Sequence, residues 1–420
     1  MRAAESLGII MAQNRIAGGI GILGPNAIEA AASNGGGART GVQKKGNIVV
    51  VQGGFPALSA TFILDQMTGL IKRGYEVETW ATYDPQEPLI HPETEKYQLL
   101  EKTRYIKIPT TLFCIYPKIW VKRFLHINNI KTLSNVDAFH VNYGANFNLI
   151  KPMFQYYNTF VLVSFHGYDA SRYFQQKSSS CYDYLFERAN LITSPSYHIR
   201  SILLQKGCPS EKMKVHRCGL NLRFFQPKPT NYKKEQIILL TVARLVEKKG
   251  IEYSLKALSK IKEKYKLRYR IVGDGPLKSD LEKLARRLGL ENQVQFLGAL
   301  DKEGVVQQMC EADIFVLTSI TAGDGDQEGL PVSLIEAQAM GLPVVSSYHT
   351  GIPELIADGQ TGLLAKEKDT EKIAEHLATL VRNHELRLTF GQKARERVKK
   401  EFDLAALNDE LADYFSSGIK

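Results

Sequence analysis

The sequence lacks the features that mark several common protein classes. It contains no uninterrupted apolar run of about 18 residues, so no membrane-spanning helix is expected. No Cys-x-x-Cys pair occurs, and the cysteines are scattered and odd in number, which argues against a disulfide framework and a zinc site. They are Cys114, Cys181, Cys208, Cys218 and Cys310. We therefore expect a reduced, cytoplasmic environment.

Acidic residues are the scarcer charged class, with 44 Asp and Glu against 54 Lys and Arg and a net charge of +10. Such a balance favours an anionic partner: nucleic acid, anionic lipid or a phosphorylated substrate. Because no zinc-finger pattern or arginine-rich tail is present, nucleic acid is not expected. Gly273-Asp-Gly275 lacks the third glycine of Gly-x-Gly-x-x-Gly and has Lys278 in its place, so a nicotinamide cofactor is not expected either.

With 420 residues, the chain is long enough for two domains of about 150–200 residues. Residues 1–46 are rich in Ala, Gly and Asn without a sustained amphipathic period, which predicts a disordered leader or a start site placed too early. A secretory signal is the weaker alternative, because Gln13, Asn14 and Arg15 cut short the apolar run 7–11. Residues 226–234 are polar, contain two prolines and resemble an interdomain linker. We therefore predict Rossmann-like domains over 47–226 and 227–400, followed by a C-terminal helix over 401–420.

Short apolar runs alternate with helical patterns on both sides of this linker. In the first half, strands are predicted at 47–52, 76–80, 138–142, 159–165, 190–193 and 214–216. In the second half, they are predicted at 237–242, 268–272, 294–297, 314–318, 343–346 and 362–365. Such alternation is typical of an α/β fold with parallel, doubly wound sheets. Two such domains in tandem predict a cleft, with ligands bound at the carboxyl ends of the strands.

The densest group of candidate residues is the segment 328–336, Glu-Gly-Leu-Pro-Val-Ser-Leu-Ile-Glu. Pro331 suits the first position of a helix, because its missing N–H costs nothing there. Glu328 is then expected in the preceding loop and Glu336 inside the helix. A single carboxylate here would simply complement the helix dipole, but the pair favours a ligand site. Backbone N–H groups around Gly329 would bind a diphosphate, and the carboxylates would accept hydrogen bonds from hydroxyls.

Segment 328–336 resembles the E-x7-E element of the family 4 retaining glycosyltransferases, which have the GT-B fold. Other motifs of that family follow in order: Val242-Ala-Arg-Leu245, Lys248-Lys249-Gly250, Val272-Gly-Asp-Gly-Pro276, Gly351-Ile-Pro-Glu-Leu-Ile356 and Gly359-x-x-Gly-Leu-Leu364. The resemblance covers about residues 48–400. More narrowly, the loop 324–329 is similar to that of enzymes of the colanic acid and amylovoran exopolysaccharide type.

The resemblance implies roles for particular residues. Arg244 and Lys249 would stabilise the leaving nucleotide diphosphate, whereas Lys248 is expected to be a solvated part of the basic turn. His166, after the apolar run 159–165, would hydrogen-bond the donor sugar and need not be a general base. The implied catalytic residues are His166, Arg244, Lys249 and Glu328. The implied donor-binding residues are Gly53, Gly54, Arg244, Lys249, Gly329, Leu330, Pro331 and Glu336. For Gly53 and Gly54, an ordinary βα turn is an equally good interpretation.

The implied reaction moves a hexose from a nucleotide-diphospho-sugar to a hydroxyl of a glycan or lipid-linked oligosaccharide. UDP-hexose is favoured over GDP-hexose as donor. No cofactor is expected, and no metal, although Asp324-Gly-Asp326 has the spacing of a metal motif. Two alternatives stay open: a non-catalytic nucleotide-sugar-binding partner of another transferase, and a nucleotide-sugar epimerase on the same fold.

Residues 118–131 combine Trp120, Phe124 and Ile127 at helical spacing with several basic residues. A helix that docks on the anionic inner face of the cytoplasmic membrane would have this pattern. A helix packed in the core with a solvated basic face has the same pattern, and we favour that interpretation.

Overall fold

The computed structural model describes residues 45–56, 61–86, 90–108, 117–155, 157–177, 180–227 and 236–419. The predicted leader lies outside these residues except for its last two positions, and so does most of the predicted linker. Within the described residues, no helix is long and apolar enough to cross a membrane.

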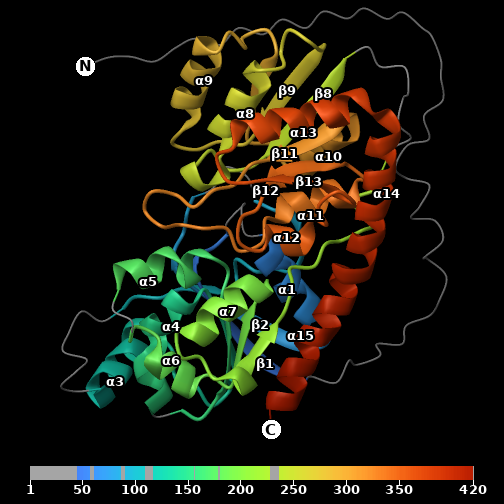
Figure 1. The fold of residues 1–420 in the computed structure, drawn as a ribbon. Coiled ribbons are helices and arrows are strands. Elements are labelled where there is room, and N and C mark those ends of the chain that lie inside the picture. The colour runs from blue at the N-terminus through green and yellow to red at the C-terminus, as the bar shows by residue number, and fades with distance from the viewer. Residues whose placement is uncertain are drawn as a thin grey trace, which may run out of the picture. The chain divides into compact units, whose positions relative to one another are not determined.

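The first half of the chain forms a seven-stranded parallel sheet in the order β3-β2-β1-β4-β5-β6-β7 (Figure 1). Its strands are β1 (Gly46–Gly54), β2 (Tyr75–Tyr83), β3 (Thr103–Tyr105), β4 (Ala138–Asn142), β5 (Phe160–Ser164), β6 (Leu191–Ser194) and β7 (Met213–Val215). Its helices are α1 (Thr61–Lys72), α2 (Pro92–Lys96), α3 (Pro117–Ile127), α4 (Gly144–Ile150), α5 (Arg172–Gln176), α6 (Asp183–Arg188) and α7 (Tyr197–Gln205). The strand β3 was not predicted, because it is a short edge strand whose residues are largely exposed.

The second half forms a six-stranded parallel sheet in the order β10-β9-β8-β11-β12-β13. Its strands are β8 (Ile237–Val242), β9 (Leu267–Val272), β10 (Val294–Gly298), β11 (Ile314–Leu317), β12 (Val344–Ser347) and β13 (Gly362–Ala365). The helices are α8 (Ile251–Ser259), α9 (Lys278–Arg287), α10 (Lys302–Glu311), α11 (Val332–Ala339), α12 (Ile352–Leu355), α13 (Thr370–Arg382), α14 (His384–Glu401) and α15 (Leu404–Gly418).

Both sheets are covered on both faces, which explains the continuous apolar runs in the sequence. In β1, Val49 and Val51 pack in the cluster with α3 and α4, whereas Ile48 and Val50 pack in the cluster with α1 and α15. In the second sheet, α10, α11 and α14 contribute to one apolar cluster, and α8, α9 and α13 to the other. The predicted α/β class with two parallel doubly wound sheets is confirmed.

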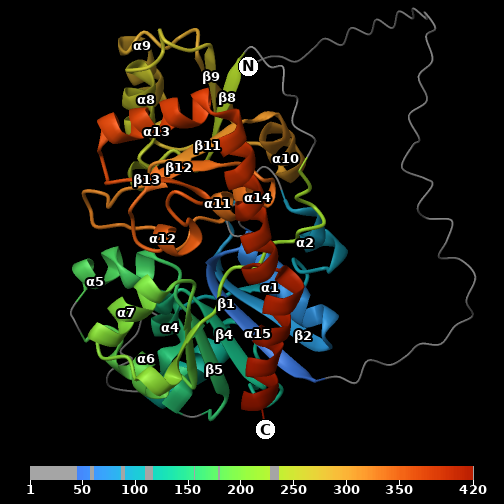
Figure 2. The same cartoon turned by 45° about the vertical axis from the view of Figure 1, so that its right-hand side comes forward.

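The last helix packs on the first sheet although it follows the second (Figures 1 and 2). After α14, the chain reaches α15, whose Leu411 and Phe415 are fully buried in the cluster formed by β1 and α1. Tyr75 donates a hydrogen bond of 3.2 Å to the carbonyl of Ala412. The C-terminal helix therefore completes the core of the first half.

The helix α3 carries Trp120 and Phe124 into the core of the first half. Their rings stack with centroids 5.3 Å apart, and Phe124 is fully buried. The favoured interpretation of residues 118–131, a core-packed helix with a basic outer face, is confirmed for these two residues. Lys122 and Arg123 lie on the exposed side.

Candidate active site

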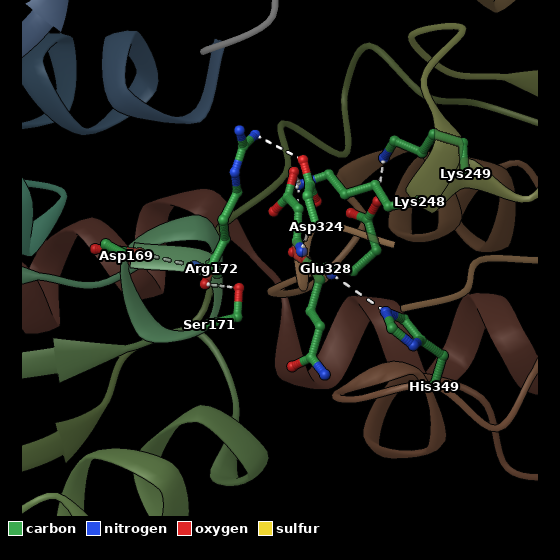
Figure 3. A network of polar contacts seen from close by, with 11 residues as sticks. Asp169, Ser171, Arg172, Lys248, Lys249, Asp324, Glu328 and His349 are labelled. Carbon is green, nitrogen blue, oxygen red and sulfur yellow. Dashed lines mark hydrogen bonds and ion pairs between the residues drawn. The ribbon is translucent and has the colours of Figure 1, made fainter. Parts of the chain in front are cut away.

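The site is built around the loop that leads into α11. Glu328 lies just before this helix, as predicted, and is only 6% exposed. Pro331 caps the helix with extended backbone angles instead of occupying its first turn, so α11 begins one residue later than predicted. Lys249 Nζ lies 3.0 Å from Glu328 Oε1 (Figure 3). Lys249 and Glu328 thus form a largely buried ion pair, although they are 79 positions apart in the sequence (328 − 249).

The charge on Glu328 is set by two lysines. Burial would raise its pKa, but Lys249 and Lys248 outweigh burial and hold the pKa below its usual value. The expectation that Lys248 is solvated was wrong: it is 8% exposed and lies 3.1 Å from the carboxylate of Asp326. Lys248 also donates to the carbonyl of Gln327 at 3.3 Å, so its ammonium holds the loop in place. Glu328 is therefore an anion in a basic surrounding.

His349 supports this loop and was missed by the sequence analysis. Its Nε2 accepts a hydrogen bond of 3.2 Å from the backbone N–H of Glu328, and its Nδ1 lies 2.6 Å from Glu367 Oε1. Nε2 is therefore unprotonated and Nδ1 carries the hydrogen. His349 follows β12 at the carboxyl end of the sheet. The rule that singled out His166, a histidine directly after a buried strand, would have found it as well.

His166 follows β5 by two residues and is positioned by its backbone and its ring. Its backbone N–H donates to Asp169 Oδ1 at 2.9 Å, and its Nε2 lies 3.0 Å from Asn142 Oδ1. The ring packs against Phe62 and Tyr143, with centroids 4.8 and 4.6 Å away. Burial lowers the pKa of His166 to about 3, so the imidazole is neutral. It can donate or accept a hydrogen bond without bringing a charge to the site.

The structure brings the predicted His166 and Glu328 regions together. A Cβ on Gly329 would lie 1.9 Å from the carbonyl oxygen of His166, and a Cβ on Gly167 would lie 2.7 Å from the nitrogen of Gly329. The two backbones therefore touch, and glycine is required on both sides. Gly167 also has a φ of 137°, which favours glycine independently.

A further contact joins the loop before Glu328 to the first half. Arg172, at the start of α5, lies 2.9 Å from Asp324 (Figure 3). Gly325 lies against Gln175, since a Cβ on this glycine would meet that side chain at 1.8 Å. The acidic residues of this loop thus pair with Arg172 and Lys248. In the described part of the chain, no group of three or more His, Cys, Asp or Glu residues is placed to hold a metal ion.

Tyr143 is strained beside His166. It follows β4 with φ of 64° and ψ of 116°, a conformation that non-glycine residues rarely adopt. Burial raises the pKa of Tyr143, and the positive charge of Arg244 opposes that rise.

Arg244 is exposed, and its guanidinium forms no hydrogen bond or ion pair with the described residues. The charge of Arg244 therefore reaches Tyr143, whose ring packs against His166. Among the described residues, its guanidinium has no partner and is available to a ligand.

Glu336 lies in a different electrostatic surrounding from Glu328. Burial raises the pKa of Glu336 to about 7, Lys302 opposes the rise, and Asp65 of α1 adds to it. The pKa of Asp65 is itself raised to about 6, chiefly by burial. The two carboxylates of the E-x7-E element thus experience different charged neighbours.

The remaining predicted site residues lie in two separate places, the loop before α11 and the end of β1. Gly329, Leu330 and Pro331 are buried in the loop before α11. Gly53 and Gly54 are the last residues of β1, which pairs with β2 as far as Gly54, so they are not a turn after the strand as predicted.

Comparison with known proteins resolves the family. The model for "Glycosyltransferase Family 4" matches residues 59–224, and the model for "Glycosyl transferases group 1" matches residues 223–397. The chain is 33% identical over 398 residues to the putative colanic acid biosynthesis glycosyltransferase WcaL of Escherichia coli K12, covering 85% of this chain and 96% of that protein. The chain belongs to glycosyltransferase family 4. It is an enzyme with the GT-B fold.

Further relatives of this glycosyltransferase agree. The amylovoran biosynthesis glycosyltransferase AmsK of Erwinia amylovora is 34% identical over 394 residues, covering 86% of this chain and 96% of that protein. The crystal structure of Anabaena HepE in complex with UDP and glucose matches with a TM-score of 0.72 and 19% identity, covering 88% of this chain and 99% of that one. The glycosyltransferase is thus homologous to enzymes of exopolysaccharide biosynthesis, and the expected resemblance is confirmed.

Proposed function

We propose that this glycosyltransferase transfers a hexose with retention from a nucleotide-diphospho-sugar to a hydroxyl of a glycan or lipid-linked oligosaccharide. The observation that carries the proposal is the Glu328–Lys249 ion pair, which lies at the start of α11 against the backbone of His166. A diphosphate bound there would meet the ammonium of Lys249 and the N–H groups that begin α11. The Glu328 carboxylate would then accept hydrogen bonds from the donor's hydroxyls.

Each residue has a distinct role in this proposal. Lys249 and the exposed Arg244 stabilise the negative charge that develops on the leaving diphosphate. His166, neutral and anchored by Asn142, hydrogen-bonds the donor sugar. The acceptor hydroxyl would attack the sugar on the face from which the phosphate leaves, and the leaving phosphate would accept its proton. Retention by this route needs no Asp or Glu nucleophile. Glu336, about one turn into α11, binds the nucleoside end of the donor.

UDP-hexose is the proposed donor, with GDP-hexose second, and exopolysaccharide biosynthesis is the proposed pathway. Two relatives are named for colanic acid and amylovoran biosynthesis, and one solved neighbour contains UDP and glucose. We propose no metal cofactor, because Asp324 and Asp326 are each turned to a basic side chain. Turnover should therefore persist in a chelator.

A thermal-shift panel of UDP, GDP, ADP and TDP and their hexoses tests the proposal. One nucleotide series should raise the melting temperature of the protein, and Glu336→Ala should lose this shift. Arg244→Ala should lower kcat about 100-fold, because it removes stabilisation of the leaving diphosphate. The absence of a shift with every nucleotide, or unchanged kinetics in both variants, would contradict the assignment.

We also propose a cytoplasmic location with peripheral contact at the anionic inner face of the membrane. On α3, Ile119 is 60% exposed beside the exposed basic residues Lys118 and Lys122. Charge attraction would dominate such contact, since Trp120 and Phe124 are committed to the core. Co-sedimentation with phosphatidylglycerol vesicles should be lost in Lys118→Glu/Lys122→Glu, and absence of binding by the wild type would refute the contact.

A further inference from the structure

Two exposed tyrosines lie at the carboxyl ends of neighbouring strands in the first sheet. Tyr83 ends β2 and is 59% exposed, and Tyr105 ends β3 and is 42% exposed. Singly exposed aromatic side chains are ordinary on protein surfaces. Both side chains therefore lie at the carboxyl ends of the strands, which is where parallel sheets bind their ligands.

The ring of Tyr83 packs against two glycines at the end of β1. Gly54 and Tyr83 are paired in register, and a Cβ on Gly54 would lie 2.8 Å from two ring carbons of Tyr83. A Cβ on Gly53 would lie 3.8 Å from the same ring. The ring therefore rests against two residues without side chains, while most of it stays open to solvent. This role separates Gly53 and Gly54 from an ordinary turn.

Polar residues are found at the same strand ends as Tyr83. The hydroxyl of Tyr105 donates a hydrogen bond of 3.0 Å to the carbonyl of Phe55, which fixes the second ring next to the first strand. Asp84 follows Tyr83, is exposed, and is the charged neighbour that adds to the raised pKa of Tyr105. An exposed aromatic face beside a carboxylate and hydroxyls matches a pyranose, which has an apolar C–H face and hydroxyls at its rim. The carboxylate disfavours an anionic lipid surface at the same place.

The position of Tyr83 relative to His166 suits the acceptor. The sheet order places β2, β1, β4 and β5 side by side, so three strand spacings of about 4.8 Å, about 14 Å in all, separate Tyr83 from the strand before His166. The proposed donor residues of the second half lie at Glu328 and Lys249, against His166. The row from His166 to Tyr83 therefore leads from the reacting centre along the first sheet.

We propose that Tyr83, seated on Gly54 and flanked by Tyr105 and Asp84, is a stacking subsite for a sugar ring of the acceptor glycan, remote from the reacting hydroxyl. The proposal rests on the proposed transferase function. A tyrosine provides a large, rigid contact area at low entropic cost, which suits recognition of a flexible oligosaccharide. The subsite would select acceptors by length.

Saturation-transfer NMR with glucose, galactose and mannose oligosaccharides of one to four units tests the subsite. Wild type should bind tri- and tetrasaccharides more tightly than monosaccharides. Tyr83→Ala should weaken the longer ligands about fivefold, equivalent to about 1 kcal/mol, and leave monosaccharides unchanged. Tyr83→Phe keeps the ring and should retain most of the affinity. Gly54→Ala should displace the ring and reproduce the loss.

Tyr197→Ala is the matched control, because Tyr197 is also 59% exposed but lies beyond β6. An equal loss in this control, unchanged binding in Tyr83→Ala, or no oligosaccharide binding by a wild type that keeps its UDP thermal shift would each overturn the subsite. A Tyr83→Ala variant that instead loses binding to phosphatidylglycerol vesicles would overturn it too and point to a membrane surface. Loss of the nucleotide shift in wild type would refute the proposed function instead.

Discussion

At the scale of single residues, Glu328 and Lys249 depend on each other. Each is at most 13% exposed at the side chain, and their charged atoms lie 3.0 Å apart. A buried charge that loses its partner costs about 3 kcal/mol or more, whereas removal of both charges together costs much less. The pair is therefore a structural element of the loop before α11 as well as a proposed contact of the donor.

We predict that Glu328→Gln lowers the free energy of unfolding by about 3 kcal/mol, and that adding Lys249→Met restores part of it. Urea unfolding of the wild type, the two single variants and the double variant measures the coupling. Lys122→Met, on the exposed side of α3, serves as control and should change stability by less than about 0.5 kcal/mol. Strictly additive losses would show that the ion pair does not hold the loop.

Glu336 should make stability depend on pH. Its pKa is raised from 4.5 to about 7, so the folded protein binds more protons than the unfolded chain between these values. Stability contributed by this proton is present below about pH 4.5 and is lost as the pH rises through about 7. The partial exposure of Glu336 to solvent makes the effect smaller than the full shift implies.

Glu336→Gln should therefore flatten the fall in melting temperature between about pH 5 and pH 8. Asp65, with its pKa raised to about 6, contributes in the same direction, so Asp65→Asn should flatten the lower part of the same range. Glu375→Gln is a suitable control because Glu375 is exposed on α13. Parallel pH curves for wild type and Glu336→Gln would contradict the raised pKa.

The sequence is a good guide to some site residues and a poor one to others, for a physical reason. Glu328, Lys249 and His166 belong to local patterns, a strand end or a helix start, that are visible over a few residues. The burial of Lys248 and the pairing of Arg172 with Asp324 depend on which loops meet, and no local pattern contains that information. The strained backbone of Tyr143 is likewise imposed by its surroundings.

At the scale of elements, α7 and α12 are linked through a helix end. Ser196 caps α7 from within the first half, accepting from the N–H of Ile199 at 3.3 Å. Glu354 of α12 caps the same end from the second half, accepting from the N–H groups of Tyr197 and His198 at 2.8 and 2.7 Å. The carboxylate also faces the positive end of the helix dipole. Two caps of different origin thus hold one helix start.

This arrangement predicts different effects for the two caps. Both Ser196→Ala and Glu354→Ala should cost about 1 kcal/mol of stability by loss of a cap. Only Glu354→Ala should also loosen the contact between the two halves. Small-angle scattering of this variant, measured in the absence of donor, should then give a larger radius of gyration than the wild type. Identical scattering curves for the two variants would show that Glu354 does no more than cap α7.

At the scale of the whole molecule, α15 ties the end of the chain to the first sheet. Two parallel sheets could be predicted from alternating apolar runs, because strands covered on both faces are continuously apolar. The helix at the C-terminus could also be predicted, but not the sheet it covers, since its amphipathic pattern shows a buried face without naming the partner. Phe415 packs against Tyr75, His140 and Phe160, which all belong to the first half.

The first half should therefore depend on the last residues of the chain for stability. Phe415→Ala should cost about 3–5 kcal/mol, because the side chain is fully buried. Asp409→Ala, which removes only an exposed partner of Arg73, should cost less than about 1 kcal/mol. Deletion of residues 403–420 should abolish protection from hydrogen exchange in β1 while β8 stays protected, because β8 belongs to a core without α15. If β1 remained as protected as β8 after the deletion, the first half would have a complete core of its own, and α15 would be an accessory helix.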